Sequence, residues 1–256
     1  MNQREYLEAA LAGFLMMILE VAGARLLYPH FGSSMIIWAS IIGMFMIVLS
    51  IGYYWGGRIS AEKDADDKVS LYLAASGLLA VALPFIVPML NFTDLPWQFL
   101  LLSSAILVSL PALALSVVSP VIIGKTGKGH AGKSAGTVYA VSTAGSIAGT
   151  FLSAFLLLPN IGVSATIAAT GVLMVALSVL FKSTRSHFLI ITGGFFIAYL
   201  MTNPFGTPTY FYTAKIVNEG DARYLLMDNW AVSALNLTDY SKPVFEYSAL
   251  MKEKMR

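Results

Sequence analysis

The sequence predicts an all-α polytopic membrane protein of about seven transmembrane helices, followed by a short C-terminal tail with a β-hairpin and a helix. Three observations lead to this fold class. Hydrophobic residues make up 57% of the 256 residues and charged residues only 12%, about half the charged share of a soluble domain. The mean hydropathy is +0.73. The apolar residues also gather into long runs, and about 20 apolar residues cross a bilayer as a helix.

The same composition excludes several other classes of protein. A soluble domain would expose more polar surface than this chain supplies, and intrinsic disorder requires a more polar chain. The chain has no cysteine, which excludes disulfide scaffolds, thiolate metal sites and cysteine nucleophiles. The histidines, at 30, 130 and 187, show no metal-site spacing. We therefore expect no metal, no cofactor and no nucleic-acid partner; the expected partner is the lipid bilayer.

The membrane domain is predicted over residues 1–202, and it contains seven apolar runs. These runs cover 7–27, 34–55, 70–90, 97–123, 135–158, 163–181 and 188–202. Helices are expected because a helix satisfies its own backbone polar groups in lipid. Pro84, Pro88, Pro111 and Pro120 fall in the third and fourth runs and are expected to kink them. The last run is short for a crossing, so it is either a seventh span or a re-entrant segment.

Lys and Arg are distributed unevenly among the connections between these runs. Nine would lie on one side of the membrane: Arg4, Arg58, Lys63, Lys68, Lys125, Lys128, Lys133, Lys182 and Arg185. Only Arg25 falls on the other side. By the positive-inside rule the N-terminus is cytoplasmic, in the cell (inner) membrane. If 188–202 crosses the bilayer, the C-terminal tail is extracytoplasmic.

Glu20 lies within the first apolar run, more than a helical turn from either end. A charge there costs roughly 2.5–3.5 kcal/mol unless a partner compensates it. Arg25 follows at five residues, which is a poor spacing for a pair on one helix face. Two interpretations stay open. Glu20 is a site for a substrate cation or a proton, or it is a structural carboxylate hydrogen-bonded to a neighbouring helix.

The fifth apolar run supplies candidate neighbours for Glu20. It carries Ser142, Thr143 and Ser146, and it ends in a Pro/Gly turn similar to the one that ends the first run. The matching turns predict that these two runs pack together, so Glu20, Thr143 and Ser146 are candidate substrate-binding residues. Small residues at four-residue spacing, Gly52-Gly56-Ser60 and Gly145-Gly149-Ser153, predict close helix contacts within the bundle.

The tail, residues 203–256, has the composition of a soluble segment. Residues 209–217 and 222–227 are predicted as strands joined by the turn residues NEGD, and a third short strand is expected at 230–235. Pro243 opens a predicted amphipathic helix over 243–255. Three strands and one helix form a small unit that is marginal without more chain.

Several short segments of the sequence resemble those of a known family. In the tail, YTAKIV (212–217), RYLLMDN (223–229) and FEY (245–247) resemble the N-terminal β-domain of spermidine synthases. In the membrane domain, EVAGARLL (20–27), GYYWGGR (52–58) and STAGSIAGT (142–150) resemble the helices fused ahead of such domains. The chain is therefore similar to a fusion of a facilitator-like membrane domain and a spermidine synthase. The resemblance suggests Arg223, Asp228 and Tyr247 as contacts of the tail with a partner.

The resemblance also implies what this chain lacks. The family's Rossmann-like domain, which carries the Gly-rich cosubstrate loop and the catalytic Asp, would need about 200 further residues. We therefore expect no catalytic residue in this chain and no aminopropyltransferase activity by the chain alone. It is a truncated chain, a naturally split subunit or a degenerate relative.

Three functions follow as hypotheses. The first is a membrane subunit that anchors a separately encoded synthase-like or methyltransferase-like protein, whose β-domain the tail completes by strand addition. The second is a polyamine or small-cation transporter with Glu20 as the cation site. The third is a structural accessory subunit of a larger membrane complex.

Overall fold

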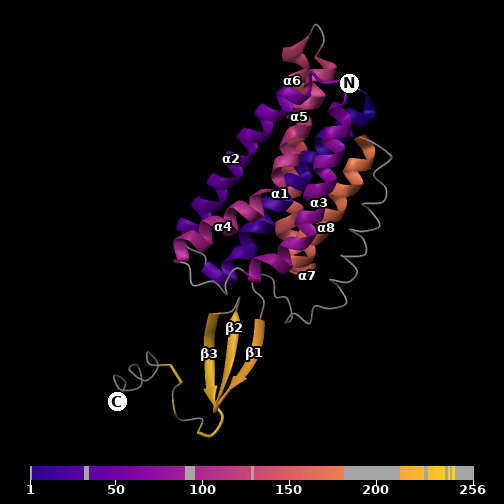
Figure 1. The fold of residues 1–256 in the computed structure, drawn as a ribbon. Coiled ribbons are helices and arrows are strands. Elements are labelled where there is room, and N and C mark those ends of the chain that lie inside the picture. Colours follow the sequence, from indigo (N-terminus) through magenta and orange to yellow (C-terminus); the bar gives the residue numbers. More distant parts are fainter. Residues whose placement is uncertain are drawn as a thin grey trace. The chain divides into compact units, whose positions relative to one another are not determined.

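The computed structural model describes residues 2–31, 35–89, 96–127, 130–181, 214–227, 230–239, 242 and 244–245. The chain forms two compact units, Met1–Asn203 and Pro204–Arg256. The described part of the first unit is helical, and that of the second contains a three-stranded sheet (Figure 1).

The first unit is a bundle of long apolar helices. Its elements are α1 (Gln3–Phe31), α2 (Met35–Ile59), α3 (Ala65–Met89), α4 (Trp97–Ser109), α5 (Ala112–Thr126), α6 (Ala131–Leu152), a π-helical turn η2 (Ser153–Leu157), α7 (Leu158–Ile161) and α8 (Val163–Phe181). Five described helices are long and apolar enough to cross a membrane, or six if the bent pair α4–α5 is one span. The seventh predicted run, 188–202, lies outside the described residues.

The helix ends differ from the predicted ends. α1 continues to Phe31 and α2 to Ile59, although connections were expected from 28 and 56. The reason is that hydropathy marks the apolar stretch, whereas backbone hydrogen bonds continue the helix into polar sequence. α3 likewise begins at Ala65, with Asp66 and Asp67 in its first turn, where acidic side chains favour a helix N-terminus.

Proline interrupts the fourth run but not the third. α3 continues through Pro84 and Pro88 to Met89. The run predicted as one span over 97–123 is instead two helices, α4 and α5, bent by 41°. Pro111 is the residue before α5, and its missing N–H removes a helical hydrogen bond at the break.

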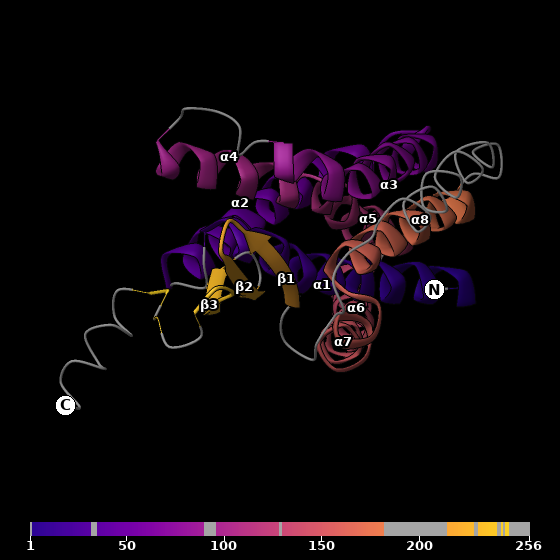
Figure 2. The same cartoon turned by 90° about the horizontal axis from the view of Figure 1, so that it is seen from below.

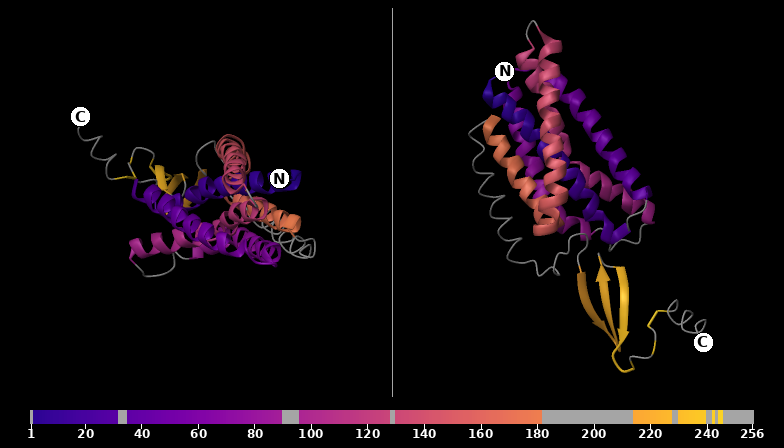
Figure 3. Two further views of the ribbon diagram at one scale, coloured as in Figure 1. Left: turned by 90° about the horizontal axis from the view of Figure 1, so that it is seen from above. Right: turned by 180° about the vertical axis from the view of Figure 1, so that it is seen from behind.

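α1 is the central helix, and it contacts α2, α3, α4, α5, α6 and α8. It lies beside α6 in the views from the front and from behind (Figures 1 and 3). A Cβ at Gly145 would lie 2.0 Å from Ala10 O, and one at Gly149 would lie 2.3 Å from Phe14 O. The other small-residue stripe packs Gly52 and Gly56 against Ser116 and Val117 of α5. Both stripes therefore form contacts within the bundle, as the sequence predicted.

α6 lies at one edge of the bundle (Figure 2). Only 11% of its apolar window is buried, compared with 61% for α1. A large part of the α6 surface is therefore not covered by the other described helices, and it can contact lipid, water or another molecule.

The second unit contains β1 (Ala214–Glu219), β2 (Ala222–Met227) and β3 (Trp230–Asn236), antiparallel in the order β1-β2-β3. Glu219 pairs with Ala222, so β1 and β2 are joined by a two-residue loop that starts at Gly220 with φ +56°. Glycine adopts this left-handed conformation without steric cost. The register shifts between Leu225 and Leu226. The predicted strands are thus present, whereas the predicted helix over 243–255 falls almost wholly outside the described residues.

Candidate functional site

Glu20 lies in the middle of α1 and is partly exposed. Its carboxylate makes no hydrogen bond or ion pair with any residue that the structure describes. The Arg25 guanidinium lies over the Tyr28 ring, with Cζ 5.7 Å from the ring centroid. As the poor spacing predicts, Glu20 and Arg25 form no ion pair, and no residue that the structure describes supplies a counter-charge to the Glu20 carboxylate.

α6 packs against the same face of α1 that carries Glu20. Ser146 Oγ donates a hydrogen bond to Gly13 O over 3.2 Å, and Glu20 follows Gly13 by about two helical turns on one face. The two helices run in the same direction, because Ala10 and Phe14 meet Gly145 and Gly149 in that order. Extending this register places Glu20 level with η2, which also contacts α1.

The expected contacts of Thr143 and Ser146 with Glu20 are not formed. The Ser146 hydroxyl donates a hydrogen bond to Gly13 O instead, and Thr143 is exposed. The physical reason is the helix register that the glycines impose. Gly145 lies against Ala10, which is about 15 Å before Glu20 along the helix axis.

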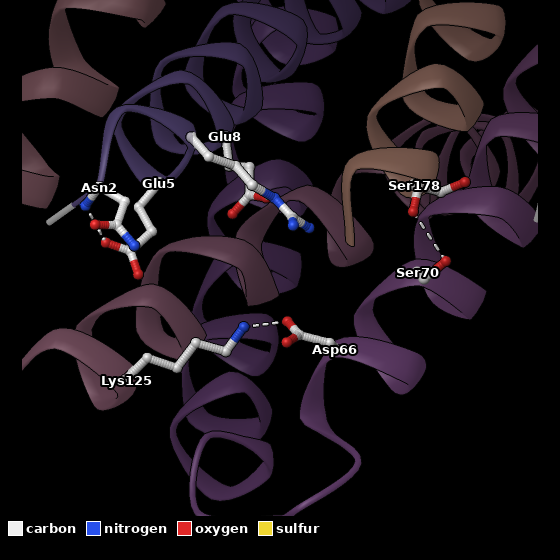
Figure 4. A network of polar contacts seen from close by, with 8 residues as sticks. Asn2, Glu5, Glu8, Asp66, Ser70, Lys125 and Ser178 are labelled. Carbon is white, nitrogen blue, oxygen red and sulfur yellow. Dashed lines mark hydrogen bonds and ion pairs between the residues drawn. The ribbon is translucent and has the colours of Figure 1, made fainter. Parts of the chain in front are cut away.

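A charge cluster that the sequence analysis missed joins four helices at one end of the bundle. Arg4 Nε lies 2.8 Å from Glu8 Oε1, and Lys125 pairs with Asp66 (Figure 4). Lys125 and Asp66 also act electrostatically on Glu8, whose side chain is only 4% exposed. Lys125 Nζ lies 5.5 Å from the centroid of the Phe181 ring. The cluster thus connects α1, α3, α5 and α8.

No sequence signal could have identified this cluster reliably. In the sequence, Asp66 and Lys125 lie in two different predicted connections between apolar runs. Only the packing of α3 on α5 brings them together. Nearby, the Ser70 hydroxyl donates to Ser178 O over 2.9 Å and ties α3 to α8 (Figure 4).

The turn between α2 and α3 carries further charge pairs. Lys68 pairs with Glu62, and its Nζ lies 3.4 Å from Asp64 Oδ2. Desolvation opposes ionisation of Asp64, but a hydrogen bond from its own backbone amide and the Lys68 ammonium lower its pKa below the ordinary 3.8. Ionised Asp64 therefore stabilises the folded turn above the unfolded pKa, and this contribution is lost as the pH falls through the folded pKa.

The tail residues proposed to contact a partner are described only in part. Arg223 Nε donates to Asn218 Oδ1 over 2.9 Å across the β1–β2 hairpin, and Arg223 is exposed. Asp228 and Tyr247 lie outside the described residues. One sheet face carries Ile216, which is 70% exposed, and Leu235, which is 45% exposed. On the other face the Tyr224 ring packs edge-on against Phe245.

Within the described residues no group of three His, Asp or Glu side chains is arranged to hold a metal ion. Comparison of the chain with protein-family models, with curated proteins and with solved structures gave no match.

Proposed function

We propose that the chain is an integral membrane subunit that anchors a separately encoded synthase-like or methyltransferase-like protein. The long apolar helices support the membrane part of this proposal. The N-terminal part of α1, the α2–α3 turn and the end of α5 lie at one end of the bundle, since Glu8, Asp66 and Lys125 meet there. Most of the described Lys and Arg residues of the bundle belong to that end, which we assign to the cytoplasm.

The observation that carries the anchoring role is the exposure of apolar side chains on one face of the described sheet. Ile216, Leu225 and Leu235 share this face by the strand register, and Ile216 and Leu235 are 70% and 45% exposed. β1 and β3 are also edge strands within the described sheet. Exposed edges and apolar side chains are features that a partner covers when it adds a strand.

Site-specific photo-crosslinking in the native cells tests this proposal. A crosslinking residue at Ile216 should capture a synthase-like or methyltransferase-like protein, identified by mass spectrometry. Val217 is the matched control, because it is the next residue of β1 and faces the opposite side of the sheet. If Ile216 captures only proteins that are neither synthase-like nor methyltransferase-like, the anchoring role is overturned.

The side of the membrane on which the tail lies limits what the partner can do. If 188–202 crosses the bilayer, the tail is extracytoplasmic and cannot present a partner to cytoplasmic S-adenosyl cosubstrates. The anchored protein would then work outside the cytoplasm or with another substrate.

A second candidate function is the transport of a small organic cation, with Glu20 as the cation site. The observation that favours it is the Glu20 carboxylate, which has no internal partner among the described residues although it lies in an apolar helix. An intramembrane carboxylate needs a compensating group, and a bound cation would supply one.

Binding of spermidine to the purified chain tests this second function. Glu20→Gln should keep expression and folding but remove binding, because the amide preserves the shape of the side chain and removes the charge. Glu5→Gln, at the start of the same helix, is the control and should bind normally. Unchanged affinity in a well-folded Glu20→Gln protein would show that Glu20 has only a structural role.

A further inference from the structure

The C-terminal half of α2 presents a line of exposed side chains that ends in a cation. Ile47, Ile51, Tyr54 and Arg58 are separated by four, three and four residues, a spacing that keeps side chains on one face of a helix. Ile47 is 53%, Ile51 40% and Tyr54 59% exposed, and Arg58 is exposed as well. We call these four residues the α2 line. The two buried glycines of α2 lie on the opposite face, against α5.

Arg58 is positioned by an aromatic ring and not by a carboxylate. Its Cζ lies 4.8 Å from the centroid of the Tyr54 ring, which is a cation–π contact. Arg58 makes no hydrogen bond or ion pair with any residue that the structure describes. The acidic side chains of the adjacent turn are engaged elsewhere, since Glu62 and Asp64 both pair with Lys68. The N–H donors of the guanidinium therefore have no acceptor within the described bundle and can bind an external anion.

The length of the α2 line corresponds to one leaflet of a bilayer. Ile47 and Arg58 are about 16 Å apart along the helix axis, and half the hydrocarbon core of a bilayer is about 15 Å thick. Trp55 lies about one turn before Arg58 and is 49% exposed, and an exposed Tyr–Trp pair at this depth is typical of a membrane interface. α2 lies at the outside of the bundle (Figures 1 and 3), with 28% of its apolar window buried.

We propose that the α2 line binds an anionic phospholipid, with one acyl chain on Ile47 and Ile51 and the phosphate on Arg58. The inference rests on the membrane part of the proposed function and names a lipid partner for it. The Tyr54 ring covers one face of the guanidinium, so the N–H donors in its plane remain available to two phosphate oxygens. A zwitterionic lipid carries the same phosphate, but its own ammonium group competes with Arg58 for it. The site therefore prefers a lipid with a net negative charge.

Quenching of tryptophan fluorescence by brominated lipids tests this site, because Trp55 lies beside Arg58. One variant keeps Trp55 as its only tryptophan, and a second keeps Trp38, at the other end of α2; the remaining tryptophans become phenylalanine. Each full chain is reconstituted in dioleoyl phosphatidylcholine mixed with brominated phosphatidylglycerol or brominated phosphatidylcholine. At Trp55 the glycerol lipid should bind about fivefold more tightly than the choline lipid, which is the effect of one basic residue near anionic lipid.

Substitutions on and beside the α2 line identify the source of this preference. Arg58→Gln should abolish the preference at Trp55 and leave the quenching at Trp38 unchanged. Tyr54→Leu should weaken the preference, because the guanidinium loses the ring that positions it, whereas Tyr54→Phe should keep it. Lys63→Gln is the matched control. It removes an exposed cation of the α2–α3 turn that does not belong to the α2 line, so the preference should remain.

Three results would contradict the proposal. Equal binding of both lipids at Trp55, or a preference that survives Arg58→Gln, would overturn the phospholipid site. An equal loss in Lys63→Gln would also overturn it, because the preference would then come from the general charge of that end of the bundle. Absence of quenching at both tryptophans by either lipid would instead overturn the insertion of the chain in a membrane, on which the site depends.

Discussion

At Gly145 the backbones of α1 and α6 touch, so this residue limits how closely the two helices approach. A side chain there would meet backbone rather than a flexible neighbour, since its Cβ would lie 2.0 Å from Ala10 O. The spacing of Gly145 and Gly149 predicted a close contact, but it could not show which α1 residues lie opposite. That register determines where Ser146 and Thr143 fall relative to Glu20, which explains why the direct contacts predicted for them are absent.

Gly145→Ala should destabilise the protein by about 1–3 kcal/mol, because the methyl group forces two helix backbones apart. Thermal unfolding in detergent measures the effect. Gly43→Ala is the control, because nothing lies within 4 Å of a Cβ at that position. The control should be neutral or more stable by up to about 1 kcal/mol, through the helix preference of alanine. Equal losses in both variants would contradict the assigned contact.

At the scale of single elements, hydropathy located the helices but not their ends or their breaks. α2 and α3 extend beyond the apolar runs because hydrogen bonds and first-turn carboxylates support helix in polar sequence. The bend between α4 and α5 occurs at Pro111, while α3 tolerates two prolines. Proline marks a place where a helix can bend, and the surrounding packing decides whether it does.

The Asp66–Lys125 pair should contribute a coupling free energy of up to about 1 kcal/mol, because both side chains are partly exposed and solvent screens them. Their exposed fractions are 49% and 31%. A double-mutant cycle with Asp66→Asn and Lys125→Gln, followed by chemical unfolding, measures this coupling. If the pair is purely electrostatic, the coupling free energy should fall to zero at high salt. Strictly additive losses at low salt would show that the helices are held without this pair.

Arg4 and Glu8 should be more strongly coupled, since the Glu8 side chain is 4% exposed. Arg4→Met leaves a buried carboxylate without its donor, which costs about 1–3 kcal/mol. Glu8→Gln removes the charge, so the Arg4→Met loss should shrink in that background. An Arg4→Met loss that is unchanged when Glu8 is glutamine would assign the effect to lost packing.

At the scale of the whole molecule, the sequence predicted a helical membrane domain and a β tail, and the described residues contain long apolar helices and a three-stranded sheet. The charge cluster was not predictable, since it depends on which connections meet in space. For the candidate site, the sequence could name residues but could not predict which of them are in contact. Glu20 could be chosen because it is a charge more than a helical turn from either end of an apolar run, but its neighbours depend on helix register.

Single cysteines should report opposite sides of the membrane at Lys63, in the α2–α3 turn, and at Asn160, in α7. Impermeant thiol reagents added to intact cells should label Asn160→Cys but not Lys63→Cys, because we expect the Lys- and Arg-rich end to face the cytoplasm. A cysteine at Ser233 of β3 should label with Asn160 if 188–202 crosses the bilayer. Labelling of Lys63 and Asn160 from the same side would overturn the span assignment.

The purified chain should form no spermidine from putrescine and decarboxylated S-adenosylmethionine. The reason is the expectation from the sequence resemblance, which covers the synthases' β-domain and the helices ahead of it but not their cosubstrate-binding domain. A chromatographic assay for product, with an active spermidine synthase as positive control, measures this. Product formed by the chain alone would refute the prediction.

The bond from Ser146 to Gly13 joins residues 133 positions apart, which has a consequence for biosynthesis. Ribosomes add about 5–20 residues per second, so α1 is synthesised on the order of ten seconds before α6 exists. During that interval the Gly13 carbonyl lacks the Ser146 hydroxyl, and Glu8 has only Arg4 of its own helix as a partner. The contact between α1 and α6 can therefore form only late in synthesis. The tail sheet has no such delay, because its strands pair with their immediate neighbours in sequence and hairpins form within microseconds.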